Sequence, residues 1–101
     1  MSDSYQVRLL PVAEEDLDEI VAYVALDNLQ AASELADRIE TRLGSLSSFP
    51  RLGRIPRDSD LRDAGYRYLI IGDYLAFFTV EKHTVIVHRI LHGTRDYREL
   101  L

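Results

Sequence analysis

Cationic side chains with a regular spacing gather near the end of this 101-residue chain. Arg89, His92, Arg95 and Arg98 recur at every third position, and Tyr97 lies among them. Arginine presents a planar fork of N–H donors that suits phosphate or carboxylate, and an aromatic ring can stack on a base. The group predicts a surface that binds either single-stranded RNA or an acidic protein. For any one arginine, pairing with a neighbouring acid is the more ordinary role.

Further arginines lie earlier in the second half of the chain, where Arg51, Arg54 and Arg57 also recur at every third position. Residues 49–101 carry 9 basic and 7 acidic side chains, whereas residues 1–48 carry 3 basic and 10 acidic ones. The second half is therefore expected to bind a partner and the first half to act as scaffold. A net charge of −5 argues against nucleic-acid binding over the whole surface.

Several other chemistries have no support in the sequence. His88 and His92 lie four residues apart on a predicted strand, which separates them by about 13 Å, too far to share one metal ion. Residues 58–63 hold three aspartates but lack the glycine and closing glutamate of a calcium loop. The chain has no cysteine, which excludes thiol catalysis and zinc–thiolate sites. It also has no nucleophile motif or glycine-rich phosphate loop, so neither a metal nor another cofactor is expected.

The elements that must position the cations follow from hydrophobic periodicity. Residues 5–10 are β-rich and predict a first strand, and an apolar stripe from Ala13 predicts a helix of about 13 residues. Asn28 is expected to cap a second helix after a short connection, so that the two helices form an antiparallel hairpin. The helical residues predicted to be buried together are Leu17, Val21, Val24, Leu35, Ile39 and Leu43.

Proline, glycine and serine interrupt the periodicity of residues 44–65 and predict a loop there. The loop is too apolar to be a free linker. Phe49, Leu52 and Ile55 are therefore expected to anchor it in the core.

Three β-rich runs follow the loop, at 66–71, 74–80 and 84–92, and tight turns between them predict an antiparallel meander. The order β-α-α-β-β-β predicts an α+β fold with the helical hairpin packed on a small, mainly antiparallel sheet, and residues 1–101 are expected to form one domain. Several strand positions are apolar on both faces. An apolar outer face predicts an interaction site for a partner.

Three segments resemble the RelE/ParE superfamily of toxins from type II toxin–antitoxin, or plasmid-stabilisation, modules. They are VRLLPxAxxDLxxI at 7–20, GYRYLIIGDYLAFF at 65–78 and VxRILHGxRDY at 87–97. The last is similar to the arginine-valine-leucine-histidine-glycine-arginine-arginine-aspartate ending that is common in the family. The resemblance covers nearly the whole chain, and the predicted element order is that of the family.

The resemblance implies one of two mechanisms. RelE-like members cleave messenger RNA in the ribosome without a metal, whereas ParE-like members inhibit DNA gyrase and cleave no RNA. RelE-like nucleases carry an arginine directly after the aromatic residue that opens the third strand, and this chain has Leu75 there, which cannot stabilise a transferring phosphate. This departure and the acidic balance favour a ParE-like, non-catalytic inhibitor of gyrase. The alternatives are a RelE-like, metal-independent, ribosome-dependent endoribonuclease and an inactive member that only binds its antitoxin.

The residues expected to contact the target under either mechanism are Arg67, Arg89, His92, Arg95 and Tyr97. The last three of these are the candidate catalytic residues if the protein is a nuclease, because histidine transfers protons near neutral pH. For Arg89 the structural alternative is an ion pair across the sheet with Asp73 or Glu81.

The resemblance also implies the partners of the chain. A co-encoded antitoxin is expected to bind it in a toxin–antitoxin hetero-oligomer, and the target is either gyrase or the ribosome with its message. No apolar run approaches the roughly 18 residues of a membrane span, so no membrane partner and a cytoplasmic location are expected.

Overall fold

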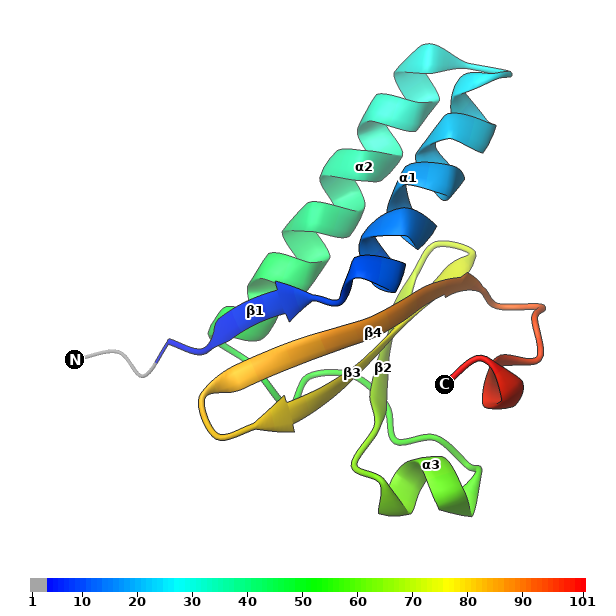
Figure 1. The fold of residues 1–101 in the computed structure, drawn as a ribbon. Coiled ribbons are helices and arrows are strands. Elements are labelled where there is room, and N and C mark those ends of the chain that lie inside the picture. The colour runs from blue at the N-terminus through cyan, green and yellow to red at the C-terminus, as the bar shows by residue number, and fades with distance from the viewer. Residues whose placement is uncertain (1–3) are drawn as a thin grey trace.

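A computed structural model describes residues 4–101 as two long helices laid across one face of a four-stranded sheet (Figure 1). In chain order the elements are β1 (Gln6–Leu9), α1 (Pro11–Ala25), α2 (Leu29–Gly44), the 3-10 turn η1 (Ser45–Ser47), α3 (Ser59–Asp63), β2 (Arg67–Ile71), β3 (Tyr74–Glu81), β4 (Thr84–His92) and the 3-10 turn η2 (Tyr97–Glu99). This architecture confirms the predicted α+β class and its element order, to which α3 is an addition. No helix within the described residues is long and apolar enough to cross a membrane.

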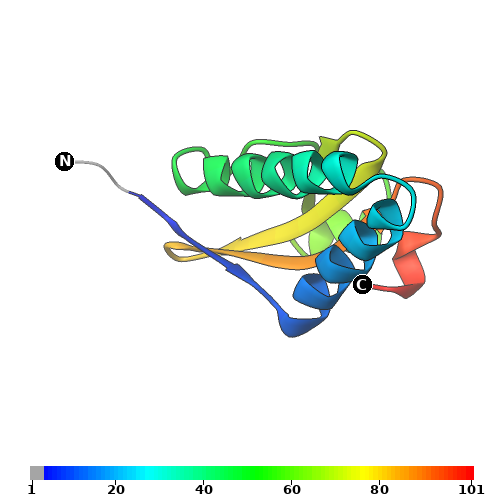
Figure 2. The same cartoon turned by 90° about the horizontal axis from the view of Figure 1, so that it is seen from above.

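The two long helices begin where local chemistry favours a helix start. Pro11 occupies the first position of α1, where a missing N–H costs nothing, so the helix begins two residues earlier than Ala13. The side chain of Asn28 accepts a hydrogen bond from the N–H of Ala31 at 3.0 Å, which confirms the predicted cap of α2. The connection between the helices is short, and Figure 2 shows both helices on the same side of the sheet.

The sheet has the strand order β1-β4-β3-β2. Strands β2, β3 and β4 form the predicted antiparallel meander, and β1 pairs in parallel with β4. The ladder between β3 and β4 shifts register where Phe77 lies opposite Arg89 and Phe78 opposite Val87, so His88 has no partner residue on β3. Neighbouring residues of a strand point to opposite faces, so Phe78 packs in the core cluster and Phe77 does not. The extra residue of the β-bulge lies on β4 and keeps Arg89 opposite Phe77 and Val87 opposite Phe78.

The core lies between the helices and the inner face of the sheet. Ile39 and Leu43 of α2 are buried there as predicted, and Leu17 and Leu35 are half-buried against the same cluster. The prediction is wrong for Val21 and Val24, which are only half-buried and lie outside the cluster. The physical reason is visible in Figure 1, where the distal half of the hairpin extends past the edge of the sheet.

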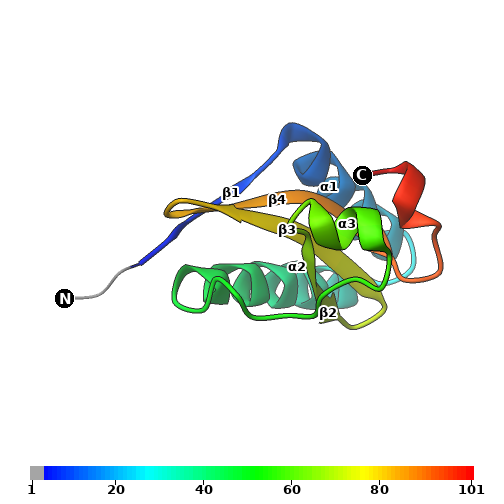
Figure 3. The ribbon, with the colours of Figure 1, turned by 90° about the horizontal axis from the view of Figure 1, so that it is seen from below.

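The outer face of the sheet is covered in part by the chain itself. Figure 3 shows α3 on the face opposite the long helices, with the C-terminal turn beside it. Phe77 is fully buried on this face, with its ring centroid 4.7 Å from that of Tyr97 and 5.6 Å from that of Tyr68. Some of the apolar outer surface that the sequence assigned to a partner is therefore occupied by the C-terminal segment.

The loop between η1 and α3 is ordered, but its expected anchors are wrong. Phe49 and Ile55 are 64% and 53% exposed, and Leu52 is exposed as well. The loop is held instead by buried Pro56 and by a two-way backbone bridge between Arg54 and Tyr68. Hydrogen bonding along the edge of β2 thus fixes the loop without burying its large apolar side chains, a contribution that hydrophobicity alone does not report.

A glycine at the middle of the same loop and an aspartate at its end shape its path. Gly53 has φ +105° and passes so close to β2 that a Cβ would lie 2.6 Å from the carbonyl oxygen of Tyr68. At the end of the loop, the side chain of Asp58 accepts hydrogen bonds from the N–H groups of Asp60 and Leu61 and so starts α3. The aspartate-rich run is therefore a capped helix, with Leu61 buried beneath it.

Candidate target-binding surface

Arg89 is held by an ion pair in the interior of the molecule. Its Nε and Nη2 atoms donate to the two carboxylate oxygens of Asp16 at 2.7 and 2.8 Å, and Asp16 is only 8% exposed. The hydrogen bond to Asp16 is the main cause of a raised pKa at Arg89, and desolvation opposes it. The alternative that Arg89 forms an ion pair within the fold is thus confirmed, but the expected partners, Asp73 and Glu81, are wrong, because the acid is Asp16.

Asp16 also completes the edge of the sheet where β1 ends. Directly after β1, the N–H of Leu10 donates to the carbonyl of Val87 on β4 at 3.0 Å. Beyond the end of β1, the edge of β4 has no neighbouring strand, and the buried N–H of Ile90 donates to Oδ2 of Asp16 at 3.0 Å. The carboxylate of Asp16 on α1 therefore accepts a backbone hydrogen bond that a neighbouring strand would otherwise accept. This acid lies on a helix, so strand pairing alone does not predict it.

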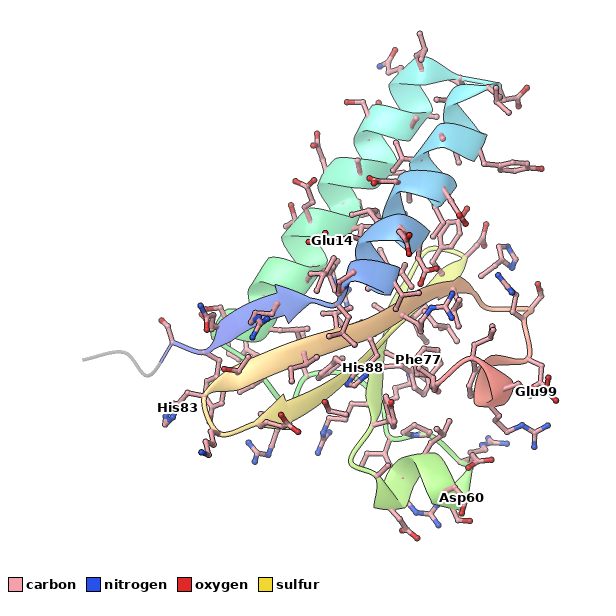
Figure 4. The ribbon with its side chains drawn as sticks, viewed as in Figure 1. Glu14, Asp60, Phe77, His83, His88 and Glu99 are labelled. Carbon is pink, nitrogen blue, oxygen red and sulfur yellow. The ribbon has the colours of Figure 1, made fainter. Side chains whose placement is uncertain are left out.

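An open groove lies between the start of α3 and the C-terminal segment, with a volume of about 420 Å³. We call it the arginine groove; its lining residues are Arg57, Asp58, Arg95, Asp96, Tyr97 and Arg98. Figure 4 shows the two elements that border it, α3 with Asp60 and the C-terminal turn with Glu99, on the side of the sheet that also carries Phe77.

The three arginines of the groove are not equivalent. Arg98 donates from Nε to Asp96 at 3.3 Å and lies 4.0 Å from Asp58, and the hydrogen bond to Asp96 raises the pKa of Arg98. No ion pair within residues 4–101 involves Arg57 or Arg95. These two exposed guanidinium groups are available to pair with a phosphate or a carboxylate of another molecule.

The remaining predicted target contacts lie apart from the groove. His92, at the end of β4, is exposed, with its Nδ1 atom 2.8 Å from the hydroxyl of Thr94 and its ring against Tyr74. Arg67 donates from Nη1 to the backbone carbonyl of Arg51 at 3.1 Å, beside the loop. Of the five residues expected to contact the target, the structure thus brings only Arg95 and Tyr97 together in the groove.

Two cations of the groove, Arg57 and Arg98, are not among the five expected target contacts. The signal for Arg57 is the recurrence of arginine at 51, 54 and 57, but nothing in the sequence indicates which of the three faces the C-terminal segment. The capped start of α3 brings Arg57 beside Arg95, because Asp58 follows it directly and lines the same groove.

A second polar cluster lies on the outer face around His88. Its Nε2 atom is 2.9 Å from the hydroxyl of Thr79, its Nδ1 atom is 3.4 Å from that of Tyr66, and burial lowers the pKa of the imidazole. A small cavity of about 130 Å³ lies beside it, bordered also by Arg89 and the C-terminal leucines. No group of three or more histidine, aspartate or glutamate side chains in the described part of the chain could hold a metal ion.

Comparison with known proteins gives this geometry a context. Residues 7–97 match the family described as the ParE toxin of the type II toxin–antitoxin system parDE. Over 88 residues the chain is 36% identical to Toxin ParE3 of Caulobacter vibrioides, a match that covers 86% of this chain and 84% of that protein.

Two solved structures share the fold. A chain of the chromosomal ParDE system from P. aeruginosa has a TM-score of 0.72 at 23% identity, with 90% of this chain and 98% of that chain covered. A chain of the RelBE2 toxin–antitoxin complex of Mycobacterium tuberculosis has a TM-score of 0.56 at 27% identity, with 88% and 91% covered.

Proposed function

Because this chain belongs to the ParE toxin family of type II toxin–antitoxin systems, we propose that it arrests growth by binding DNA gyrase and that a co-encoded antitoxin neutralises it. The observation that carries the proposal is the arginine groove, where Arg57 and Arg95 are exposed and form no ion pair within residues 4–101. Charge-assisted contacts from two such arginines can hold an acidic surface or a phosphate. The antitoxin is supported by the two neighbours in solved structures, which come from toxin–antitoxin systems.

A non-catalytic mode of action is supported by the surroundings of Leu75. This half-buried side chain lies opposite Leu91 on β4 and Ile70 on β2, so it contributes to apolar packing across the sheet. Charge that develops on a transferring phosphate needs donors aimed at it, and an aliphatic side chain offers none. The family match likewise favours inhibition over RNA cleavage, since it is to the ParE toxins.

The alternative is a ribosome-dependent endoribonuclease, and one contact favours it. His92 and Arg95 lie in one turn, joined by a hydrogen bond of 3.0 Å from the N–H of Arg95 to the carbonyl of His92. An exposed imidazole and a guanidinium without an ion pair, carried by the same turn, could transfer a proton and stabilise a phosphate. An inactive member that only binds its antitoxin is the third outcome.

One experiment separates the three outcomes. The purified protein is added to a supercoiling reaction of DNA gyrase and, in parallel, to ribosomes that hold a defined message. We expect supercoiling to be inhibited and the message to stay intact. Cleaved message with normal supercoiling would establish the nuclease instead, and activity in neither reaction would leave only antitoxin binding. In cells, expression alone should arrest growth, and co-expression of the neighbouring gene should restore it.

A further inference from the structure

An exposed apolar surface lies on the loop between η1 and α3. We call it the loop patch, formed by Phe49, Leu52 and Ile55 with Arg51 and Arg54 between them. Phe49, Leu52 and Ile55 are 64%, 41% and 53% exposed, and an open cavity of about 390 Å³ at residues 48–52 is lined by the first two of them. Large apolar side chains left exposed together on one segment mark interaction sites in soluble proteins.

The loop patch is fixed in place and is not a free linker. The N–H of Leu52 donates to the carbonyl of Phe49 at 3.0 Å, and Arg54 and Tyr68 exchange backbone hydrogen bonds of 2.8 and 2.9 Å. The guanidinium of Arg67 also donates from Nη1 to the backbone carbonyl of Arg51 at 3.1 Å. A partner therefore meets a preformed surface and loses little affinity to ordering it.

The charge of the loop patch indicates the chemistry of its partner. Residues 49–57 contain three arginines and no acid. The guanidinium groups of Arg51 and Arg54 take part in no ion pair within residues 4–101. The backbones of these two residues hold the loop against Arg67 and Tyr68. A complementary surface therefore carries apolar side chains with aspartate or glutamate between them.

We propose that the loop patch is the docking surface for an acidic, apolar segment of the antitoxin. This inference rests on the part of the proposed function that gives the chain an antitoxin and is independent of gyrase. Ile55 lies two residues before Arg57, so a segment bound here reaches the arginine groove and can cover it. Neutralisation then follows from occlusion of the groove.

Two other interpretations of these surfaces fit less well. Nucleic acid would find one ring to stack on, that of Phe49, and none on Leu52 or Ile55, and the net charge of −5 repels it at a distance. Tyr23, Leu26 and Leu29 form another exposed apolar surface at the tip of the helical hairpin. That tip points away from the C-terminal segment in Figure 1, so a segment bound to the tip alone would leave the groove open.

The test measures the affinity of the purified, full-length chain for the purified product of the neighbouring gene. Leu52→Ser with Ile55→Ser removes two of the three apolar side chains of the loop patch, and Arg51→Glu with Arg54→Glu reverses its charge. Leu26→Ser with Leu29→Ser at the hairpin tip and Arg42→Glu on α2 are the matched controls. We expect each loop-patch variant to weaken binding at least about tenfold, and the charge variant to lose most at low salt.

The controls should bind within about threefold of the wild type. Thermal melting shows whether each variant is folded; should the serine variant be unfolded, the charge variant decides. Unchanged affinity in the folded loop-patch variants overturns the inference, as does loss of binding confined to the hairpin tip. Loss of binding to a 20-nucleotide single-stranded RNA with unchanged antitoxin affinity assigns the loop patch to nucleic acid and also overturns it. Normal supercoiling by gyrase would contradict only the proposed target.

Discussion

Asp16 on α1 accepts two parallel hydrogen bonds from Arg89 on β4, although the two residues are 73 positions apart in the sequence. The same carboxylate accepts the N–H of Ile90 at 3.0 Å. One acid thus joins the first helix, the edge of the last strand and, through the contact of Arg89 with the carbonyl of Leu100, the C-terminal segment. The position of the arginine groove depends on this junction, because the groove is built on that C-terminal segment.

Removing the acid should destabilise the protein strongly. Asp16→Ala leaves the half-buried guanidinium of Arg89 without its partner and the buried N–H of Ile90 without an acceptor, and we expect a cost of about 2 to 4 kcal/mol in the free energy of unfolding. Urea denaturation measures it. The control is Asp18→Ala, whose carboxylate is exposed on the same helix and whose removal should change stability by less than about 0.5 kcal/mol. A cost below about 1 kcal/mol for Asp16→Ala would show that the ion pair does not hold the junction.

The second prediction concerns the core under α2. Ile39 is fully buried between the helices and the sheet, so Ile39→Ala leaves a cavity and should lower the free energy of unfolding by about 2 to 5 kcal/mol. Leu26→Ala is the matched control, because Leu26 is 87% exposed at the hairpin tip and should be nearly neutral. Midpoints of urea denaturation compare the two. Equal effects would mean that the helices pack differently from the structure.

Much of this fold follows from local sequence patterns. The apolar stripe containing Ile39 and Leu43 locates α2, Asn28 marks its start, and the turn with Lys82 at φ +55° separates the last two strands as expected. These features depend on periodicity and on single residues with strong conformational preferences, which act over a few positions.

The wrong predictions concern residues whose positions depend on contacts between segments far apart in the sequence. Apolar content suggested that Phe49 and Ile55 are buried, but the backbone bridge from Arg54 to β2 fixes the loop and leaves them outside. The meander predicts which strands flank Arg89 and so points to acids on the sheet, whereas the sequence does not predict which face of α1 lies against β4. In the same way, the charge pattern located Arg95 but not Arg57 in the candidate site, since only the folded chain brings the loop to the C-terminal segment.

The third prediction is a loss of stability in mild acid. Burial lowers the pKa of His88 below its usual value, so as the pH falls from about 7 to about 5 the unfolded chain binds a proton at this residue more readily than the folded chain does. His88 therefore has no effect on the stability of the folded state at a pH well above the pKa of the unfolded chain. As the pH falls below that pKa, His88 destabilises the folded state. Groups that face the ring are the hydroxyls of Tyr66 and Thr79, and the charge of Glu81 partly opposes the shift.

Replacing the imidazole should flatten this pH dependence. His88→Gln keeps a hydrogen-bonding side chain near Thr79 but does not titrate, so its stability should fall less than that of the wild type between pH 7 and 5. Urea midpoints at several pH values measure the difference. His83→Gln, in the exposed turn between β3 and β4, controls for the general effect of removing an imidazole. A slope in His88→Gln equal to that of the wild type would remove His88 as its source.

The last prediction concerns how the arginine groove recognises its target. Arg57 and Arg95 are exposed and have no ion-pair partner within residues 4–101, whereas Arg98 is held by Asp96. Arg57→Ala and Arg95→Ala should therefore each weaken inhibition of gyrase about tenfold or more, and Arg98→Ala should weaken it less, because its contacts lie partly within the chain. All three variants should melt at the temperature of the wild type, since surface charges contribute little to folding.

Conservative variants and salt test whether the contact is a charge-assisted one. Arg95→Lys keeps the charge but loses the planar fork, so it should recover part of the inhibition that Arg95→Ala loses. Inhibition by the wild type should weaken as ionic strength rises, and the salt dependence should be shallower in Arg95→Ala, because one charged contact is gone. The readout is the concentration of toxin that halves supercoiling, with Arg42→Ala on α2 as a control outside the groove. Full inhibition by both Arg57→Ala and Arg95→Ala would show that the target binds another surface of this toxin.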